Sequence, residues 1–239
     1  MGRHGTIAGR KAAQDNKRAA IFTKCARAIM IAAKNGGDPA YNAPLKHAIE
    51  KAKSGGMPKD KIEQAIKKGT GELAGDSLTE SRFEGYGPSG VAVIVDVLTD
   101  NSNRATSSVK HIFDRHGGNL GSQGSVSYMF ERKGVILIEK GMADEEAIME
   151  AGLDAGLEDL IDADEYWEVR TATEDLQAVA DALREAGFSL EEADVDFVPN
   201  IDAKPKDEQA LKTLTKMIDA FENDEDVQKV YTNCSVPLL

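Results

Sequence analysis

The residues with the clearest chemical potential are lysines and arginines near the N-terminus. Arg10, Lys17 and Lys24 recur every seven residues, so an α-helix carries them along one face. Arg27 and Lys34 fall next to that stripe. Such cations neutralise backbone phosphates and release counterions whatever the base sequence. The spacing therefore predicts a phosphate-binding face. The alternative interpretation is a solvated face that only keeps a small helical bundle in solution.

The charge distribution along the chain favours the first interpretation. Residues 1–72 hold 15 Lys and Arg against 6 Asp and Glu, a balance of +9. Residues 73–239 hold 14 against 35, a balance of −21. A basic segment on an acidic body is typical of a protein that meets nucleic acid with one end. Aromatic residues make up only 5% of the chain, so we expect contact with the nucleic-acid backbone rather than base stacking.

The candidate nucleic-acid contacts share a positive charge in or beside this basic segment. Lys67 and Lys68 end the third predicted helix, and Arg104 follows an apolar strand beside Asn101 and Asn103. The full set is Arg10, Lys11, Lys17, Arg18, Lys24, Arg27, Lys67, Lys68 and Arg104.

Other motifs give little support for catalysis. Gly85–Gly90 matches GxGxxG, but a dinucleotide site needs that pattern at the start of a helix, and Val91–Leu98 predicts a strand. Gly117–Gly124 lacks the Lys-Ser/Thr of a P-loop. We interpret it as a mobile connection, with an anion-binding backbone nest as the alternative. The four histidines and two cysteines lack metal-ligand spacing. We therefore expect no enzyme, no catalytic residue, no metal and no cofactor.

The bulk composition places limits on location and partners. The sequence has no apolar run approaching the roughly 20 residues that cross a membrane, and its N-terminus lacks the apolar core of a signal peptide. We expect a cytoplasmic protein without a membrane partner and without a small-molecule substrate.

The elements that position the basic residues are three helices. Apolar residues at a 3.6-residue period predict helices from near Arg10 to Lys34, from Pro44 to Lys53 and from Pro58 onward. Paired glycines after the first two helices are C-terminal stop signals. Three short helices with narrow apolar stripes predict a small bundle.

Strands and helices then alternate. A polar linker is expected over Glu72–Ser81, a central strand over Val91–Leu98, a helix over Ser102–Arg115 and a half-buried strand over Ser125–Glu131. From Gly134 to Val198 the predicted order is β-α-β-β-α-β, the ferredoxin-like arrangement.

The last two elements imply that the middle domain is discontinuous. A helix over Lys206–Glu222 and a strand over Val227–Thr232 are too few to form a domain alone, so we predict that they complete the middle domain. The predicted fold class is α+β: a basic three-helix bundle over residues 1–76, a discontinuous α/β domain over 77–133 and 199–239, and an acidic ferredoxin-like domain over 134–198 inserted in it.

Several short motifs resemble the YebC/PmpR family across nearly the whole chain. They are Arg10–Arg18, Ile21–Lys24, Gly36–Pro39, Met57–Asp60, Ile66–Gly69, Glu84–Pro88, Thr99–Asn101, Asn103-Arg104, Gly117-Gly118 and Gly124–Phe130.

The resemblance implies a helical bundle and two α/β domains, one inserted in the other. It also implies a non-enzymatic regulator, described in the family either as a DNA-binding transcriptional regulator or as a ribosome-associated translation factor that eases synthesis through stretches such as consecutive prolines. A mitochondrial relative activates translation of a cytochrome oxidase subunit. Many members begin Gly-His-Ser-Lys-Trp, whereas this chain has Gly2–Ile7 without that Trp. Any contact that this aromatic makes cannot be transferred.

Three classes of function follow from the sequence. The first is a DNA-binding transcriptional regulator, which is the customary family description. The second is a translation factor bound to rRNA or the ribosome. The third is a scaffold that binds only proteins, for which the basic stripe has no role. The sequence contains no motif that separates the first two.

Overall fold

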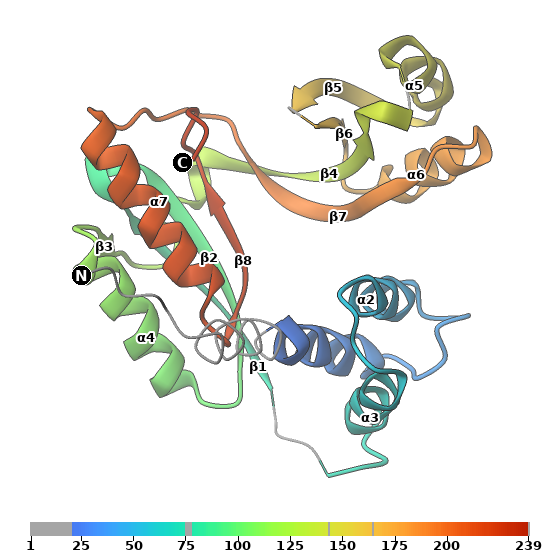
Figure 1. The fold of residues 1–239 in the computed structure, drawn as a ribbon, viewed down its shortest axis with the longest axis horizontal. Helices are drawn as coiled ribbons and strands as arrows, with labels where there is room; N and C mark the ends of the chain where they lie inside the picture. The colour runs from blue at the N-terminus through green and yellow to red at the C-terminus, as the bar shows by residue number, and fades with distance from the viewer. Residues whose placement is uncertain (1–20, 75–77, 143, 164, 239) are drawn as a thin grey trace, which may run out of the picture. The chain divides into compact units, whose positions relative to one another are not determined.

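The computed structural model describes residues 21–74, 78–142, 144–163 and 165–238 (Figure 1). They form two compact units: one holds the chain up to Val126 together with Ala203–Leu239, and the other is Ser127–Asp202. The predicted α+β class is confirmed, with N-terminal helices and two sheet-containing regions, one inserted in the other.

The N-terminal helices pack around an apolar centre of their own. Residues 21–33 are helical, α2 spans Ala43–Ser54 and α3 spans Lys59–Gly69. Asn42 caps α2, because its side chain accepts a hydrogen bond from the Leu45 amide and donates to the carbonyls of Ala32 and Gly36. The buried centre consists of Ile29, Ala33, Leu45, Ile49, Ala52, Met57, Ile62 and Ala65.

The first sheet has the order β3-β1-β2-β8, and every neighbouring pair is antiparallel. Its strands are β1 (Thr79–Tyr86), β2 (Ala92–Thr99), β3 (Asn119–Leu120) and β8 (Val227–Thr232). The β8 strand pairs with β2, which confirms that the C-terminal segment returns to this sheet.

Two helices, α4 (Ser102–Arg115) and α7 (Glu208–Glu222), cover one face of this sheet (Figure 1). Val93 and Val95 of β2 point into the cluster that holds Phe113 of α4 and Phe221 of α7. The two phenylalanine rings meet edge to face with centroids 5.0 Å apart. Burial of this apolar face therefore fixes both helices on the sheet.

The expected linker over Glu72–Ser81 is wrong at its C-terminal end, because β1 begins at Thr79. The polar composition concealed this strand. Arg82 of β1 lies opposite Asp96 of β2, and its Nε is 2.7 Å from Asp96 Oδ1. The charged arginine side chain therefore has its ion-pair partner within the sheet. Gly85 is needed because a Cβ there overlaps the Phe113 ring and the Asn119 carbonyl.

The inserted unit has the ferredoxin-like order that the sequence predicted. Its elements are β4 (Phe130–Glu139), α5 (Glu145–Gly152), β5 (Leu157–Ala163), β6 (Tyr166–Thr171), α6 (Leu176–Glu185) and β7 (Leu190–Pro199). The sheet order is β5-β6-β4-β7, with all neighbours antiparallel. Both helices bury their apolar side chains against one face of the sheet, as Ile148 and Leu183 illustrate.

The predicted strand over Ser125–Glu131 is also misplaced. A single 3-10 turn spans Ser127–Met129, and the strand begins at Phe130 and continues through Gly134 to Glu139. The sequence pattern predicts two separate strands, one ending at Glu131 and one starting at Gly134, but they form a single strand. The glycine instead allows close approach of Leu176 and Thr171, which a Cβ at this position would overlap.

The two glycine-rich segments are connections. Gly85–Gly90 joins β1 to β2 through a 3-10 turn, Pro88–Gly90, and does not begin a helix. In the second segment the Gly124 and Val126 amides donate to the two carboxylate oxygens of Glu84, each at 2.9 Å. Glu84 is buried, so an internal carboxylate fills the position of the anion considered for a backbone nest.

Candidate nucleic-acid interface

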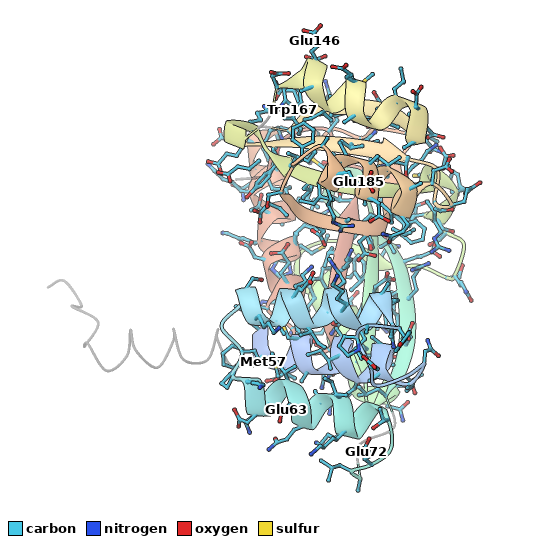
Figure 2. All side chains as sticks on the ribbon, turned by 90° about the vertical axis from the view of Figure 1, so that its right-hand side faces the viewer. Met57, Glu63, Glu72, Glu146, Trp167 and Glu185 are labelled. Carbon is cyan, nitrogen blue, oxygen red and sulfur yellow. The ribbon has the colours of Figure 1, made fainter. Side chains whose placement is uncertain are left out.

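The described part of the bundle keeps a positive balance. Residues 21–74 contain 10 Lys and Arg against 5 Asp and Glu, which leaves +5. Residues 134–198, by contrast, contain 3 against 20. Figure 2 shows the labelled Glu146 of α5 and Glu185 of α6 among the exposed carboxylates of that segment. The asymmetry of the sequence is therefore also an asymmetry between two folded regions.

Lys67 and Lys68 are exposed in the last turn of α3. The inward residues Ile62 and Ala65 hold α3 against the bundle, so the two lysines project from a fixed helix. Cations near a helix C-terminus also interact favourably with its carbonyl dipoles. This end of α3 can present two positive charges to a phosphate backbone.

Five exposed lysines of α2 and α3 were not singled out from the sequence. Lys46 and Lys53 lie seven residues apart on α2, and Lys61 and Lys68 do so on α3, so each pair shares a helix face. The signal that could have revealed them is their position outside the apolar stripe of each helix. The five are Lys46, Lys51, Lys53, Lys59 and Lys61.

One neighbouring carboxylate reduces the charge of this surface only slightly. Figure 2 labels Glu63 on α3, whose Oε1 lies 3.8 Å from Lys59 Nζ. Both side chains are exposed, so the pair is screened by water and salt and adds little to stability.

Lys24 and Arg27 have a different environment, because they contact the turn between α7 and β8. Lys24 Nζ donates to the Glu222 carbonyl at the end of α7, and Arg27 Nη1 donates to the Glu225 carbonyl. Arg27 Nη1 also lies 2.8 Å from Asp226 Oδ1, and the side chains of this ion pair are only 12% and 6% exposed. Two predicted phosphate contacts are thus bonded to oxygen atoms of the chain itself.

Arg104 reaches the same turn from α4. Its Nη2 lies 3.0 Å from both carboxylate oxygens of Asp226 and 2.7 Å from Asp100 Oδ1. Asn101 caps α4 by accepting a hydrogen bond from the Arg104 amide, which fixes the start of the helix. Arg27 and Arg104, which are 77 positions apart in sequence, therefore converge on one carboxylate.

The titration of these groups reflects their surroundings. Burial lowers the pKa of Lys24, and the attraction of Asp224 and Glu222 only partly opposes that shift. The hydrogen bond from Arg104 lowers the pKa of Asp100, and hydrogen bonds to Asp100 and Asp226 raise the pKa of Arg104. Asp100 and Arg104 therefore stay charged at neutral pH.

The remaining predicted contacts are Arg10, Lys11, Lys17 and Arg18, and all four lie outside the described residues. No helix within the described ranges is long and apolar enough to cross a membrane. In the same part of the chain, no group of three or more His, Cys, Asp or Glu side chains is arranged to hold a metal ion.

Comparison with known proteins gives consistent results along the chain. A family model described as "TACO1/YebC protein N-terminal domain" matches residues 3–72, and one described as "TACO1/YebC second and third domain" matches residues 78–234. Together they cover the bundle and both sheets.

Curated relatives match over nearly their whole length. A protein of Persephonella marina is 50% identical over 95% of this chain and 92% of its own. One of Clostridioides difficile is 49% identical over 99% of this chain and 100% of its own. Both bear the name "Probable transcriptional regulatory protein".

A solved structure shares the fold. The crystal structure of a conserved hypothetical protein from Aquifex aeolicus superposes with a TM-score of 0.85. It is 41% identical and covers 92% of this chain and 91% of its own.

Proposed function

The chain belongs to the TACO1/YebC family, and from that premise we propose that it is a non-enzymatic regulator of transcription that binds DNA through its basic helical bundle. Its relatives are named as transcriptional regulatory proteins, which supports the regulatory role. We place the protein in the cytoplasm, with nucleic acid as its partner and without a cofactor.

The observation that carries the proposal is the set of exposed lysines on α2 and α3. These side chains project from two helices that share one buried core, so they form a fixed set of charges. The acidic remainder of the chain repels phosphates and leaves the bundle as the favoured contact. Since lysines contact phosphates without reading bases, we expect binding with weak sequence preference.

Fluorescence anisotropy with labelled duplex DNA tests the proposal. We expect Lys67→Glu with Lys68→Glu to weaken binding about tenfold or more, because two attractive contacts become repulsive. The matched control reverses two exposed lysines outside the bundle, Lys110 on α4 and Lys216 on α7. An equal loss in the control contradicts a specific role for the bundle.

The same assay separates the two regulatory classes. Tighter binding to duplex DNA than to RNA of equal length and charge supports a transcriptional regulator. Preference for RNA, or co-sedimentation with ribosomal particles that RNase abolishes, replaces it with the rRNA- or ribosome-bound translation factor that the sequence left open. If neither nucleic acid binds at low salt, the third class, a scaffold that binds only proteins, takes its place.

A further inference from the structure

We infer that the turn Glu222–Asp226 is an internal competitor for nucleic acid: it occupies Lys24 and Arg27 in the free protein, and phosphates displace it when the bundle binds. The inference rests on the proposed function and adds a means of regulating the same basic surface. We call the turn and its two basic partners the clasp.

The chemistry of the clasp resembles that of a phosphate contact. Lys24 and Arg27 donate to the carbonyls of Glu222 and Glu225, and Arg27 also pairs with the Asp226 carboxylate. The turn follows the end of α7, where unpaired carbonyls carry partial negative charge. A guanidinium binds carboxylate and phosphate oxygens with the same donor geometry, so nucleic acid and the turn use the same groups.

The clasp is polar, which makes it releasable. The apolar cluster of the bundle and the apolar cluster beneath α4 and α7 have no member in common among the described residues. Among the described residues, the contacts between the two parts include three hydrogen bonds and an ion pair, and the longest of these hydrogen bonds joins Lys34 Nζ to the Leu78 carbonyl at 3.4 Å. Salt screens a largely buried pair such as Arg27–Asp226 only weakly, so release needs a phosphate that bonds Arg27 in place of the carboxylate.

Asp226 does not lose all its partners when Arg27 leaves. Arg104 Nε and Nη2 lie 3.2 and 3.0 Å from its Oδ2, and the Asp226 amide donates to Asp224 Oδ1. The Asp226 carbonyl accepts from the Leu98 amide at 2.8 Å, which ties the turn to β2. Release therefore leaves no isolated buried charge, whose cost would otherwise hold the clasp shut.

The test compares two variants that each remove one carboxylate. Asp226→Asn removes the ion pairs with Arg27 and Arg104, whereas Asp219→Asn removes an exposed charge from α7 seven residues earlier. In duplex DNA titrations we expect Asp226→Asn to tighten binding about fivefold and Asp219→Asn to change it less than twofold. Adding Arg27→Gln to Asp226→Asn removes the gain, because Arg27 is then absent, whereas a gain that persists comes from Arg104 and overturns the inference.

Hydrogen exchange of the wild-type protein gives a second measurement that needs no variant. The clasp predicts that nucleic acid slows amide exchange in α3 and speeds it in residues 222–226. Slower or unchanged exchange in that turn on binding overturns the inference, even where a variant fails to fold.

The outcomes separate the two proposals. If the wild type binds but Asp226→Asn binds no more tightly than Asp219→Asn, the clasp is wrong and the proposed function stands. If neither wild type nor variants bind DNA or RNA at low salt, the proposed function is wrong, and the inference that rests on it falls too.

Discussion

Two groups of basic side chains carry the same charge per residue but have different surroundings. One group is the exposed lysines of α2 and α3, and the other is Lys24 and Arg27, which contact the turn between α7 and β8. Lys67 and Lys68 are exposed to solvent, whereas Arg27 is only 12% exposed and pairs with Asp226. A charge surrounded by water can exchange its solvent for a phosphate at little cost. A charge already bonded within the protein must first give up that partner. The comparison teaches that residues of the same charge differ in availability, because some are already paired within the fold whereas others are exposed to solvent.

The largest expected loss of stability comes from disrupting the packing of α3, the helix that carries Lys67 and Lys68, against the first helix. Gly69 ends α3, and a Cβ there overlaps the Met30 carbonyl and the Ala33 side chain of the first helix. We expect Gly69→Ala to cost about 2 kcal/mol of unfolding free energy, because the two helices must move apart. Chemical denaturation followed by circular dichroism measures the loss. Gly141→Ala, where a Cβ meets nothing within 4 Å, is the control, and an equal effect there contradicts the packing argument.

A somewhat smaller effect is expected from breaking the turn. Asp226→Ala removes the carboxylate that Arg27 and Arg104 share. The Arg27 side chain is mostly buried and loses its ion-pair partner. We expect a loss of about 1–2 kcal/mol, below the usual range for buried pairs because Arg104 is half exposed and keeps Asp100. Thermal unfolding tests it against Asp219→Ala. A change as small as that of the exposed control shows that the ion pair contributes nothing.

The smallest effect is expected at Lys24. Burial is the dominant influence on its pKa, which it lowers, so the charged form is held in the folded protein at a cost. Below the folded-state pKa this cost is present in full, and it disappears as pH rises above the ordinary value for lysine. Lys24→Met at pH 7 is therefore expected to change unfolding free energy by no more than about 0.5 kcal/mol. A loss as large as that of Asp226→Ala shows that the Glu222 contact outweighs the cost of burial.

Periodicity predicted the helices well because their apolar stripes are regular. It failed at β1 and at the start of β4, where the deciding contacts are between residues distant in sequence. The Arg82–Asp96 pair and the packing of Leu176 against Gly134 exist only after the strands have assembled. From the local sequence pattern alone, the start of β1 is predicted as a polar linker, and Gly134 within β4 is predicted as a break between two strands.

The candidate site shows the same limit. Charge and spacing identified Lys67 and Lys68, which the structure leaves exposed. They also identified Arg27 and Arg104, but nothing near either residue in sequence indicates a shared partner at Asp226. The carboxylate comes from the turn between α7 and β8, more than 120 positions away from Arg104. A sequence shows which residues carry charge, and only the fold shows which of those charges are already paired.

The most direct test of the central claim is the salt dependence of DNA binding. The logarithm of the association constant is measured against the logarithm of salt concentration for the wild type and for Lys67→Ala with Lys68→Ala. If both lysines contact phosphates, the slope of the variant is smaller in magnitude by about 2, because each lost contact releases about one counterion fewer. A slope equal to that of the wild type, or a wild-type slope near zero, contradicts the claim that the bundle binds nucleic acid through these lysines.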